Sequence, residues 1–594
     1  MPKVFVSGSQ ETFTCDKGAS VFSACGDAHI DSPCNGKATC GKCRIKIVSG
    51  EVGAVSETEM QFLTKRELES GVRLACLTVP VSDLTIEPVR KESGHKVLTS
   101  GYLPEFEYCP DTSKNCVSIP AAAIETQEPY EDILKRVFSL GDDWDIDGSI
   151  PVAEGEATGI FFRDRLTAIE KGDTRDRLFG AAIDIGTTTL ACSLADMNTG
   201  NEIATVSMLN PQKQYGLDVL SRISYEIENG KDAVAALQNS ITGAINDMLD
   251  EVAKSAEISL EQIYEITVAA NSTMLHMLLG VDARKLGKAP FAPVFTSPKT
   301  LRASSIGINA ASGAVLYCLP GVSSYIGADI VAGAFVCELD KAAGNIIFID
   351  IGTNGEIVLS KKGQLFCCSC AAGPAFEGMN ISAGMRAASG AIESIAIHES
   401  GVECGVIGNV APAGICGSGI VSAVSELIRT GIVGKDGAFI KKDRLADGDY
   451  RQKLIRLNGT KREFIVADTT PALIITQRDV RHIQLAKGAI LSGVYALLNS
   501  AGLQVEDLDG AVIAGQFGAH LPAESLVGVG IVPKELSGRI KYVGNTSKTG
   551  AYMALMSGAA KRELRKFSHK MKYVELSETP GYERLFSECL LFPS

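Results

Sequence analysis

The sequence has no long apolar segment. No run approaches the roughly 18 consecutive apolar residues that a membrane-spanning helix needs, and the N-terminal text MPKVFVSG lacks the apolar stretch of a signal peptide. We therefore expect no membrane span and a cytoplasmic location. Positive charge is also in deficit, with 57 Lys and Arg against 70 Asp and Glu and a net charge of −13. This balance disfavours nucleic-acid binding, which needs surplus Lys and Arg to neutralise phosphates.

What is present is an ordinary folded composition with many cysteines. Of the 594 residues, 45% are hydrophobic and 21% are charged, and this length indicates more than one domain. Seventeen cysteines in a chain without an export signal argue against a disulfide framework. Some of them should therefore be metal ligands.

The densest group of cysteines lies near the N-terminus and has a distant fourth member. These residues are Cys34, Cys40, Cys43 and Cys76. Gly36 and Gly41 allow the backbone to turn closely and its N–H groups to point at sulfur atoms. The spacing resembles the plant-type [2Fe–2S] pattern C-x4-C-x2-C…C, although the first gap is one residue longer. A zinc site and inert buried thiols are the alternatives, but zinc ribbons usually have two CxxC pairs and this loop has one.

The surrounding segments favour a β-grasp ferredoxin domain over residues 1–92. Their patterns predict a hairpin at 3–7 and 11–15, helices at 19–28 and 58–69, and strands at 44–48 and 84–89. Residues 93–177 then form a linker and a small middle segment. Residues 94–115 lack periodicity, and 129–140 (PYEDILKRVFSL) can form one amphipathic helix. A docking or dimerisation domain and a simple spacer are both compatible with this stretch.

Two matching texts mark the remainder of the chain. Residues 181–195 read AAIDIGTTTLACSLA and residues 345–359 read NIIFIDIGTNGEIVL. Each is an apolar strand, an Asp, a Gly-Thr turn and a second strand, and the repetition suggests two similar halves. Together they could clamp a nucleoside triphosphate. Asp184 and Asp350 would hold hydrated Mg²⁺, Gly186 and Gly352 would allow close approach of phosphate, and Thr187, Thr188, Thr189, Thr353 and Asn354 would donate hydrogen bonds.

These hairpins resemble the two phosphate motifs of the sugar kinase, Hsp70 and actin superfamily of ATPases. The resemblance implies two RNase H-like halves over residues 178–594, with connecting helices at 324–335 and 545–558. It also implies an adenosine motif in DGAVIAGQFG at 509–518, which contains Gly515, Gln516 and Gly518. No G-x4-G-K-[ST] motif is present, so a P-loop is excluded.

Two carboxylates are candidates for the hydrolytic step. Asp329, on the first expected connecting helix, could orient the attacking water, and Glu356 follows the second turn and could act through water. A structural role for Asp329 and an ion pair for Glu356 are the alternatives. Other conspicuous residues are interpreted as packed side chains, namely Cys15, Cys25, His276, Cys367, Cys368, Cys370 and Cys416.

The chain as a whole resembles the reductive activators of corrinoid proteins. The resemblance lies in the cysteine loop and in texts such as LNPQKQYGLDVLSRISY, ANSTMLHMLLG and AAGPAFEGMNISAGMRAASGAIE. Relatives often read AGAFG where this chain has AGQFG, and GNAAGTG where it has GNTSKTG. Some relatives also carry a C-terminal cysteine-rich [4Fe–4S] region, whereas the tail here contains only Cys589, so we expect a single cluster.

The resemblance implies an anaerobic ATP-dependent electron transferase. It would pass one electron from a [2Fe–2S] cluster to the cob(II)amide of a corrinoid protein and regenerate the cob(I)amide used in methyl transfer. ATP, Mg²⁺, an external low-potential electron donor and a homodimer belong to the same expectation. The alternatives are an ATP-driven activator of another low-potential enzyme and a nucleotide-dependent redox-sensing module.

Overall fold

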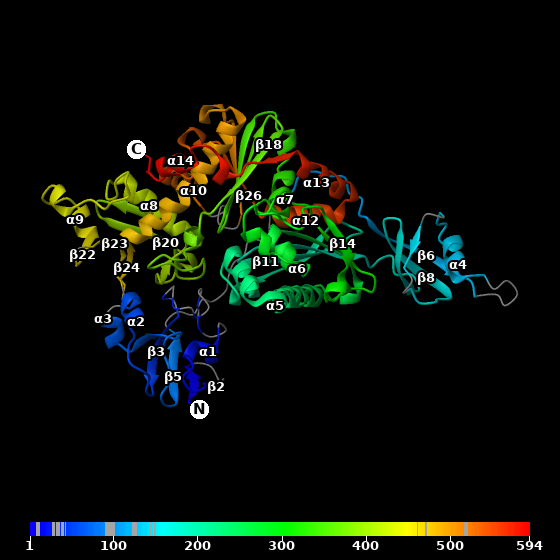
Figure 1. Ribbon diagram of the computed structural model, residues 1–594, viewed down its shortest axis with the longest axis horizontal. Helices are drawn as coiled ribbons and strands as arrows, with labels where there is room; N and C mark the ends of the chain where they lie inside the picture. The colour runs from blue at the N-terminus through cyan, green and yellow to red at the C-terminus, as the bar shows by residue number, and fades with distance from the viewer. Residues whose placement is uncertain are drawn as a thin grey trace. The chain divides into compact units, whose positions relative to one another are not determined.

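The computed structural model describes residues 1–593 except 8–11, 27–29, 31, 33–35, 37, 39–40, 42, 64, 89–100, 122–127, 142–143, 148–149, 460, 470–471 and 516–520. The chain forms two compact units, each assembled from three stretches of sequence (Figure 1). One unit contains Met1–Lys96, Lys213–Arg222 and Pro374–Ile483, and the other contains Val97–Gln212, Ile223–Gly373 and Gln484–Ser594.

The N-terminal domain is a five-stranded sheet with the order β2-β1-β5-β3-β4. Strands β1 and β5 are parallel and the other pairs are antiparallel, which is the expected β-grasp arrangement. Apolar side chains such as Val4, Ile45 and Leu84 fill its core. Its elements are β1 (Lys3–Val6), β2 (Thr12–Thr14), α1 (Val21–Cys25), β3 (Arg44–Ser49), α2 (Glu57–Phe62), α3 (Lys65–Glu69), β4 (Val72–Leu74) and β5 (Leu84–Pro88).

The single helix predicted over 58–69 is wrong, because the structure has two short helices there. Helix α2 ends at Leu63, whose φ of −106° and ψ of 138° are extended. It begins at a capping box in which Ser56 and Glu59 satisfy each other's backbone N–H groups. Glu59 is also paired with Arg73 at 2.8 Å, and this buried pair ties α2 to β4.

The remainder of this unit contains two three-stranded sheets, β20-β19-β21 and β22-β23-β24. Helix α8 packs on β19. The elements are β19 (Ala391–His398), β20 (Gly401–Val406), β21 (Gly414–Ile415), α8 (Gly417–Arg429), α9 (Arg451–Leu454), β22 (Ile455–Asn458), β23 (Lys461–Ala467) and β24 (Leu473–Thr476).

In the second unit, the middle segment is a folded domain and not a spacer. Its sheet has the order β6-β8-β9-β7, and one helix packs on it. Ile133, Phe138 and Phe161 lie in its core, and Trp144 contacts Phe161 edge-on at 5.6 Å. The elements are β6 (Thr112–Ile119), α4 (Tyr130–Val137), β7 (Asp145–Ile146), β8 (Gly155–Phe162) and β9 (Arg165–Lys171).

Two six-stranded sheets with the same internal topology form the rest of this unit. In each sheet, three antiparallel strands are followed by two strands that are parallel to β10 or to its counterpart β16. The strand orders are β12-β11-β10-β13-β15 and β18-β17-β16-β25-β26. An extra edge strand, β14 or β27, completes each sheet. This duplication confirms the two expected RNase H-like halves. The strands are β10 (Phe179–Ile185), β11 (Thr189–Asp196), β12 (Glu202–Leu209), β13 (Ile263–Ala270), β14 (Lys299–Arg302), β15 (Val315–Cys318), β16 (Asn345–Ile351), β17 (Gly355–Lys361), β18 (Gln364–Cys370), β25 (Gly510–Ala514), β26 (Ile540–Gly544) and β27 (Met571–Tyr573).

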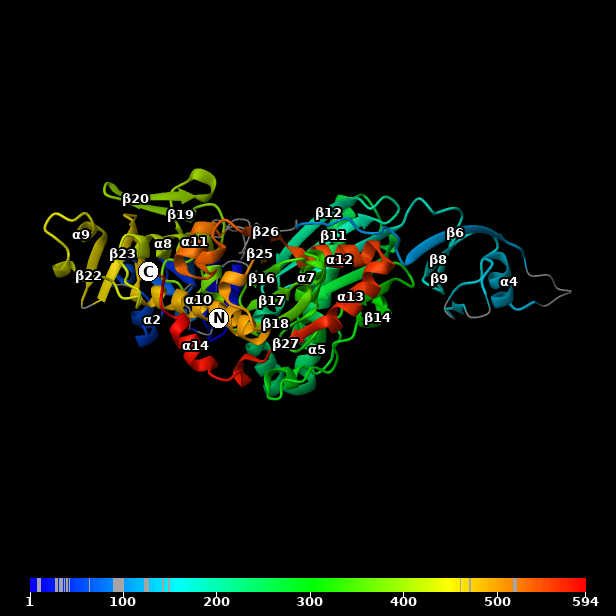
Figure 2. The same cartoon turned by 90° about the horizontal axis from the view of Figure 1, so that it is seen from above.

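The two expected connecting helices are α7 and α12, which lie side by side (Figures 1 and 2). Small residues allow this approach, because a Cβ on Gly550 would lie 2.5 Å from the Cβ of Ala332. Helix α7 begins at Ala328, with Gly327 as its N-cap, and not at 324 as expected. Ser324 lies before the helix, where its hydroxyl donates a hydrogen bond to the backbone carbonyl of Phe291. The helices are α5 (Val219–Ser255), α6 (Ser272–Leu278), α7 (Ala328–Val336), α10 (Gln477–Ala501), α11 (Ala523–Val529), α12 (Thr546–Met556), α13 (Gly558–Lys570) and α14 (Tyr582–Cys589).

No helix within the described ranges combines the length and the apolar character that crossing a bilayer requires.

Candidate functional site

The first phosphate hairpin joins β10 to β11 and keeps its turn closed through backbone hydrogen bonds. Gly186 N–H donates to Thr189 O at 2.9 Å, and Asn210 Nδ2 donates to Gly186 O at the same distance. Thr187 Oγ1 accepts a hydrogen bond from Asn271 Nδ2 at 3.1 Å. Thr187, Thr188 and Thr189 are all partly exposed at this turn, so they can meet a ligand.

The second phosphate hairpin joins β16 to β17 through a tighter turn, in which Ile351 pairs with Gly355, whereas Ile185 pairs with Leu190 in the first. Gly352 N–H donates to Asn354 O at 3.0 Å, and Asp350 lies opposite Glu356 in the strand register. Thr353 and Asn354 are partly exposed, like the threonines of the first turn. Both hairpins therefore present a carboxylate and a polar turn at the end of a buried strand.

The expected adenosine motif at 509–518 contains β25, and its glycine-rich end begins where β25 ends. Gly515 has a φ of +87°, and a Cβ there would overlap Asp350 Oδ1, so both the backbone angle and the space require glycine. Gln516 and Gly518 lie outside the described residues. Gly515 therefore brings the backbone that follows β25 close to Asp350, where a ligand of the second hairpin would lie.

The connecting helices bring further polar groups to the hairpins. Asp329 lies in the first turn of α7, and its Oδ1 accepts the Ile330 N–H at 2.9 Å. At the start of α12, Asn545 Nδ2 donates to Asp184 Oδ2 at 2.9 Å and Ser547 Oγ donates to Asp184 Oδ1 at 2.7 Å. The first hairpin carboxylate is therefore held by the second connecting helix.

Four carboxylates influence one another electrostatically at this place. Burial, followed by the charge of Asp184, raises the pKa of Asp350 to about 7. Burial also raises the pKa of Asp329 to about 7, and the charges of Asp350 and Asp184 contribute to the rise. The pKa of Glu356 is raised well above its usual range by burial and by Asp329 and Asp350. The pKa of Asp184 is raised by burial, although hydrogen bonds from Ser547 and Asn545 oppose the rise.

This concentration of like charge is chemically suited to a divalent cation with its bound phosphates. Carboxylates held near one another in a partly buried place disfavour their ionised forms, and a divalent cation relieves that cost. Among the described residues, no group of three His, Cys, Asp or Glu side chains is arranged to bind a metal directly. A Mg²⁺ ion held here would therefore use water and phosphate oxygens for most of its ligands, as that ion prefers.

In the cysteine site, the structure describes two of the four predicted ligands. Cys43 Sγ and Cys76 Sγ are 3.2 Å apart, with Cys43 buried and Cys76 partly buried. Gly36 and Gly41 have φ values of 75° and 64°, a backbone region that favours glycine and that fits the close turns predicted for this loop. Cys34 and Cys40 lie outside the described residues. The described half of the site fits a thiolate-bound cluster.

The cysteines interpreted as packed side chains are buried in the structure. Cys370 Sγ donates to Gly355 O at 3.0 Å, and Cys416 Sγ donates to Ile392 O at 3.2 Å. Burial raises the pKa of the Cys367 thiol to about 12 and that of Cys368 well above its usual range. These interpretations are confirmed, because thiols in such surroundings are poor metal ligands.

His276 is also confirmed as a core residue. Its Nδ1 lies 2.7 Å from Ser272 O, and its Nε2 accepts the Val294 N–H at 3.1 Å. The ring stacks on Phe295 at 4.4 Å, and burial lowers its pKa.

Reasoning from the sequence did not assign roles to Asn210, Asn271, Asn545 or Ser547. All four side chains contact a hairpin, but each comes from a segment distant in sequence from the turn or Asp that it contacts. The sequence contains one indication of a role for Asn545 and Ser547, namely that both lie at the start of the predicted second connecting helix.

Comparison with known proteins agrees with this organisation. A family model described as the C-terminal domain of RACo, the ASKHA domain, matches residues 344–594, and one described as the RACo middle region matches 179–342. A model of the 2Fe-2S iron–sulfur cluster binding domain matches residues 4–81.

Individual relatives match along most of the chain. The corrinoid activation enzyme RamQ of Eubacterium limosum is 29% identical over 601 residues, covering 98% of this chain and 97% of its own. The [Co(II) methylated amine-specific corrinoid protein] reductase of Methanosarcina barkeri is 25% identical, covering 62% of this chain and 68% of its own. A solved structure of a reductive activator for corrinoid, iron–sulfur protein is 30% identical, with a TM-score of 0.72 and coverage of 100% of this chain and 98% of its own.

Proposed function

Because the chain belongs to the RACo family of reductive activators for corrinoid proteins, we propose that it uses ATP to drive the one-electron reduction of a corrinoid protein. The substrate is the cob(II)amide form of that protein, and the product is the cob(I)amide nucleophile. Residues 1–92 carry the electron, residues 178–594 bind and hydrolyse ATP, and residues 93–177 form the linker and middle domain.

The electron-carrying part would use the four cysteines Cys34, Cys40, Cys43 and Cys76. The convergence of Cys43 and Cys76 and the left-handed glycines of the loop support this assignment. When bound, a [2Fe–2S] cluster supplies one-electron transfer at about −400 mV. An external donor of low potential would replace each electron that leaves.

The nucleotide part would divide its tasks among the hairpins and connecting helices. Asp184 and Asp350 would hold hydrated Mg²⁺, and the turn residues Gly186, Gly352, Thr187, Thr188, Thr189, Thr353 and Asn354 would bind phosphate oxygens. Gly515, with Gln516 and Gly518, would face the adenosine. Asp329 would orient the attacking water, since a carboxylate with a pKa of about 7 can accept a proton near neutral pH. Glu356 would assist through a second water.

ATP is needed because the electron moves uphill. Each 100 mV of unfavourable potential costs about 2.3 kcal/mol. We propose that the ATP-bound conformer docks the corrinoid protein and changes its cobalt ligation, which raises the potential of the acceptor. Hydrolysis then releases the partner.

The observation that carries this proposal is the electrostatic coupling of four carboxylates of one unit, Asp184, Asp350 and Glu356 in the duplicated hairpins and Asp329 in the first turn of α7. Such a cluster is costly without a cation, and a kinase-like or ATPase-like site explains it. The same chain contains the paired thiols of Cys43 and Cys76, which a simple kinase does not need.

The direct test mixes the anaerobically reconstituted full chain, a chemical reductant, Mg-ATP and a corrinoid protein in its cob(II)amide form. A corrinoid iron–sulfur protein and a methylamine-specific corrinoid protein are suitable substrates, since two relatives are named for them. We expect the cob(I)amide absorbance to appear with ATP and not with ADP. The proposal is wrong if no cob(I)amide forms in an ATP-dependent manner with either substrate.

Two further measurements separate the alternatives. Cys76→Ser should remove the visible absorption of the cluster and the reduction of cobalt, whereas Cys116→Ser, at another partly buried thiol, should remove neither. ATP hydrolysis without any turnover of cobalt would favour an activator of a different enzyme. Nucleotide binding without hydrolysis would favour a sensing module.

A further inference from the structure

Residues 101–111, here called the strap, form the segment that leads from the ferredoxin-like domain toward β6 of the middle domain. The strap runs beside α12 and is anchored at both ends of that helix. At the first end, Tyr102 N–H donates to Val543 O at 2.8 Å, and Gly101 pairs with Gly544 in an isolated antiparallel bridge. The start of the strap is therefore hydrogen-bonded to the last residues of β26.

This first anchor lies against the residue that holds the carboxylate of the first hairpin. A Cβ on Gly101 would lie 2.5 Å from both Asn545 O and Thr549 Oγ1, so only glycine allows the strap to approach so closely. Asn545 Nδ2 is in turn hydrogen-bonded to Asp184 at 2.9 Å. A short series of contacts thus runs from the strap through Asn545 to Asp184.

The second anchor lies beyond the other end of α12. Cys109 N–H donates to Met556 O at 3.0 Å, and Gly558 N–H donates to Cys109 O at 2.8 Å. Asp111 Oδ2 is paired with Lys561 Nζ of α13 at 3.0 Å. Two backbone bonds and an ion pair therefore fix the strap at the start of α13.

The ion pair of the second anchor continues into the first half of the ATPase. Lys561 is fully buried and is also paired with Glu265 of β13, whose Oε2 accepts a hydrogen bond from Thr112 Oγ1 at 2.5 Å. Arg163, at the β8–β9 turn of the middle domain, is paired with Asp111 at 2.9 Å. Removal of one member of a buried ion pair is strongly destabilising, so this end is firmly fixed.

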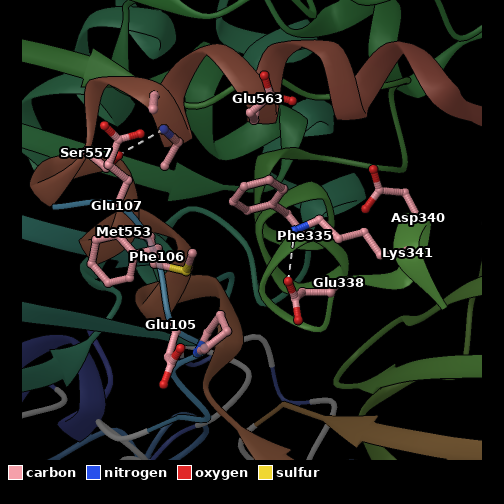
Figure 3. A pocket seen from close by; sticks show the side chains of 13 residues that line it. Glu105, Phe106, Glu107, Phe335, Glu338, Asp340, Lys341, Met553, Ser557 and Glu563 are labelled. Atoms are coloured by element: carbon pink, nitrogen blue, oxygen red, sulfur yellow. Dashed lines mark hydrogen bonds and ion pairs between the residues drawn. The ribbon is translucent and has the colours of Figure 1, made fainter. Parts of the chain in front are cut away.

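Between its anchors, the strap borders a cavity of about 220 Å³ (Figure 3). Phe106 of the strap, Phe335 of α7 and Met553 of α12 line this cavity, and acidic side chains including Glu105, Glu107 and Glu338 surround it. Phe106 also contacts the ring of Tyr552 edge-on at 6.4 Å. The middle of the strap therefore shares this cavity with both connecting helices and has free volume beside it.

We propose that the strap is a positioning element that couples the nucleotide site to the chain leading to the ferredoxin-like domain, with Gly101 and Asn545 as the point of transmission. A change at Asp184 on nucleotide binding moves the start of α12, and the strap follows because Gly101 is bridged to Gly544, the residue directly before Asn545. Coupling of this kind is measured by the free energy with which a ligand at one site changes the equilibrium at the other. It requires a structural element that both sites influence. The inference rests on the proposed function, because it presumes that Asp184 responds to nucleotide.

Peptide-resolved hydrogen exchange of the full chain tests the coupling directly. The protein is compared with no nucleotide, with Mg-ADP and with Mg and a non-hydrolysable ATP analogue. We expect peptides of both hairpins to exchange more slowly with nucleotide. We also expect peptides containing the Tyr102 and Cys109 N–H groups to differ between the ADP and ATP states by about fivefold or more, the lower end of typical coupling factors.

The possible outcomes separate the two proposals. If the hairpins respond and the strap does not, the coupling is overturned and the proposed ATP site stands. If neither responds, the ATP site itself is wrong, and the coupling is overturned with it.

A substitution at the first anchor supplies the functional readout. Gly101→Ala places a methyl group against Asn545 O, and we expect the ratio of cob(I)amide formation with ATP to that without ATP to fall by about fivefold or more. The matched control is Gly243→Ala in α5, where a Cβ meets nothing within 4 Å and the ratio should stay unchanged. A purely structural role for Gly101 predicts a lower melting temperature but an unchanged ATP response of the strap peptides, and that result would refute the coupling.

Discussion

The two phosphate hairpins share the text DIGT, yet their strand registers and the surroundings of their aspartates differ, since Asp184 lies opposite Ala191 and Asp350 lies opposite Glu356. Asp184 accepts hydrogen bonds from Asn545 and Ser547, whereas no residue in the described part of the chain donates one to the Asp350 side chain. Instead, Gly515 approaches Asp350 without any side chain. The comparison teaches that duplication supplied two similar carboxylates, of which one is held by hydrogen bonds from the start of a helix and the other is not.

The largest effect should follow from removal of the carboxylate of Asp350, which no described residue holds by a side-chain hydrogen bond. Asp350→Asn keeps the size of the side chain but removes the charge that would face the cation, and we expect ATP hydrolysis to fall by about 100- to 1,000-fold. Asp184→Asn should cost less, since its partners Asn545 and Ser547 still position the side chain. The control is Asp340→Asn, at a carboxylate paired with Lys570 on α13. Equal losses for the two hairpin variants would contradict the comparison.

The second effect concerns the carboxylate between the hairpins. The pKa of Asp329 is raised from 3.8 to about 7, mainly by burial, so the folded protein binds more protons than the unfolded chain between these pH values. Its contribution to stability is therefore present at low pH and is lost as the pH rises toward 7. We expect the melting temperature of the nucleotide-free protein to fall over this range, and Asp329→Asn to make the dependence flatter.

The same variant has a kinetic consequence. If Asp329 orients the attacking water, Asp329→Asn should lower kcat for ATP by about 100-fold or more. Loss of the pH dependence of stability without loss of turnover would assign Asp329 a structural role, which is the alternative that the sequence left open.

Much of the fold could be predicted because its signals are local. The strand–turn–strand texts around Asp184 and Asp350 have the right residues within fifteen positions, and the apolar pattern of α12 is continuous. Short elements were missed, since β4 has only three residues and its pattern cannot be recognised alone. The break at Leu63 was missed for a similar reason, because an extended residue between two helical turns leaves the periodicity almost unchanged.

The contacts between distant segments could not be predicted from the sequence. Asn545 is 361 residues from Asp184, and no local pattern shows that its side chain donates to that carboxylate. The CCSC text at 367–370 was interpreted as packed thiols, and strand β18 buries Cys367, Cys368 and Cys370, but the sequence alone did not show which segments cover them. Chemistry within one turn can thus be inferred from the sequence, whereas chemistry shared between turns needs the structure.

A smaller effect should follow from removing one of the hydrogen bonds that the start of α12 donates to Asp184. Asn545→Ala removes the bond to Asp184 and also the N-cap bond in which Asn545 Oδ1 accepts the Lys548 N–H at 2.9 Å. We expect a loss of about 1 kcal/mol in the free energy of unfolding and a tenfold loss of ATP hydrolysis, or about 1.4 kcal/mol in activation free energy. Ser547→Ala removes only the Asp184 bond and should change hydrolysis with less effect on stability. Unchanged hydrolysis in Ser547→Ala beside a clear loss in Asn545→Ala would show that capping, and not the hydrogen bonding of Asp184, is what matters.

The smallest effect should appear at the threonines of the two turns. Thr187 Oγ1 accepts a hydrogen bond from Asn271, which is itself the N-cap of α6, so Thr187 is positioned before any ligand arrives. A single neutral hydrogen bond contributes about 1 kcal/mol, and Thr187→Ala should therefore raise KM for ATP by about fivefold with little change in kcat. Thr353→Ala gives the matched measurement at the second hairpin. A change in kcat and not in KM at either threonine would mean that the turn acts on the transition state, and the assignment of both turns to ground-state phosphate binding would then be wrong.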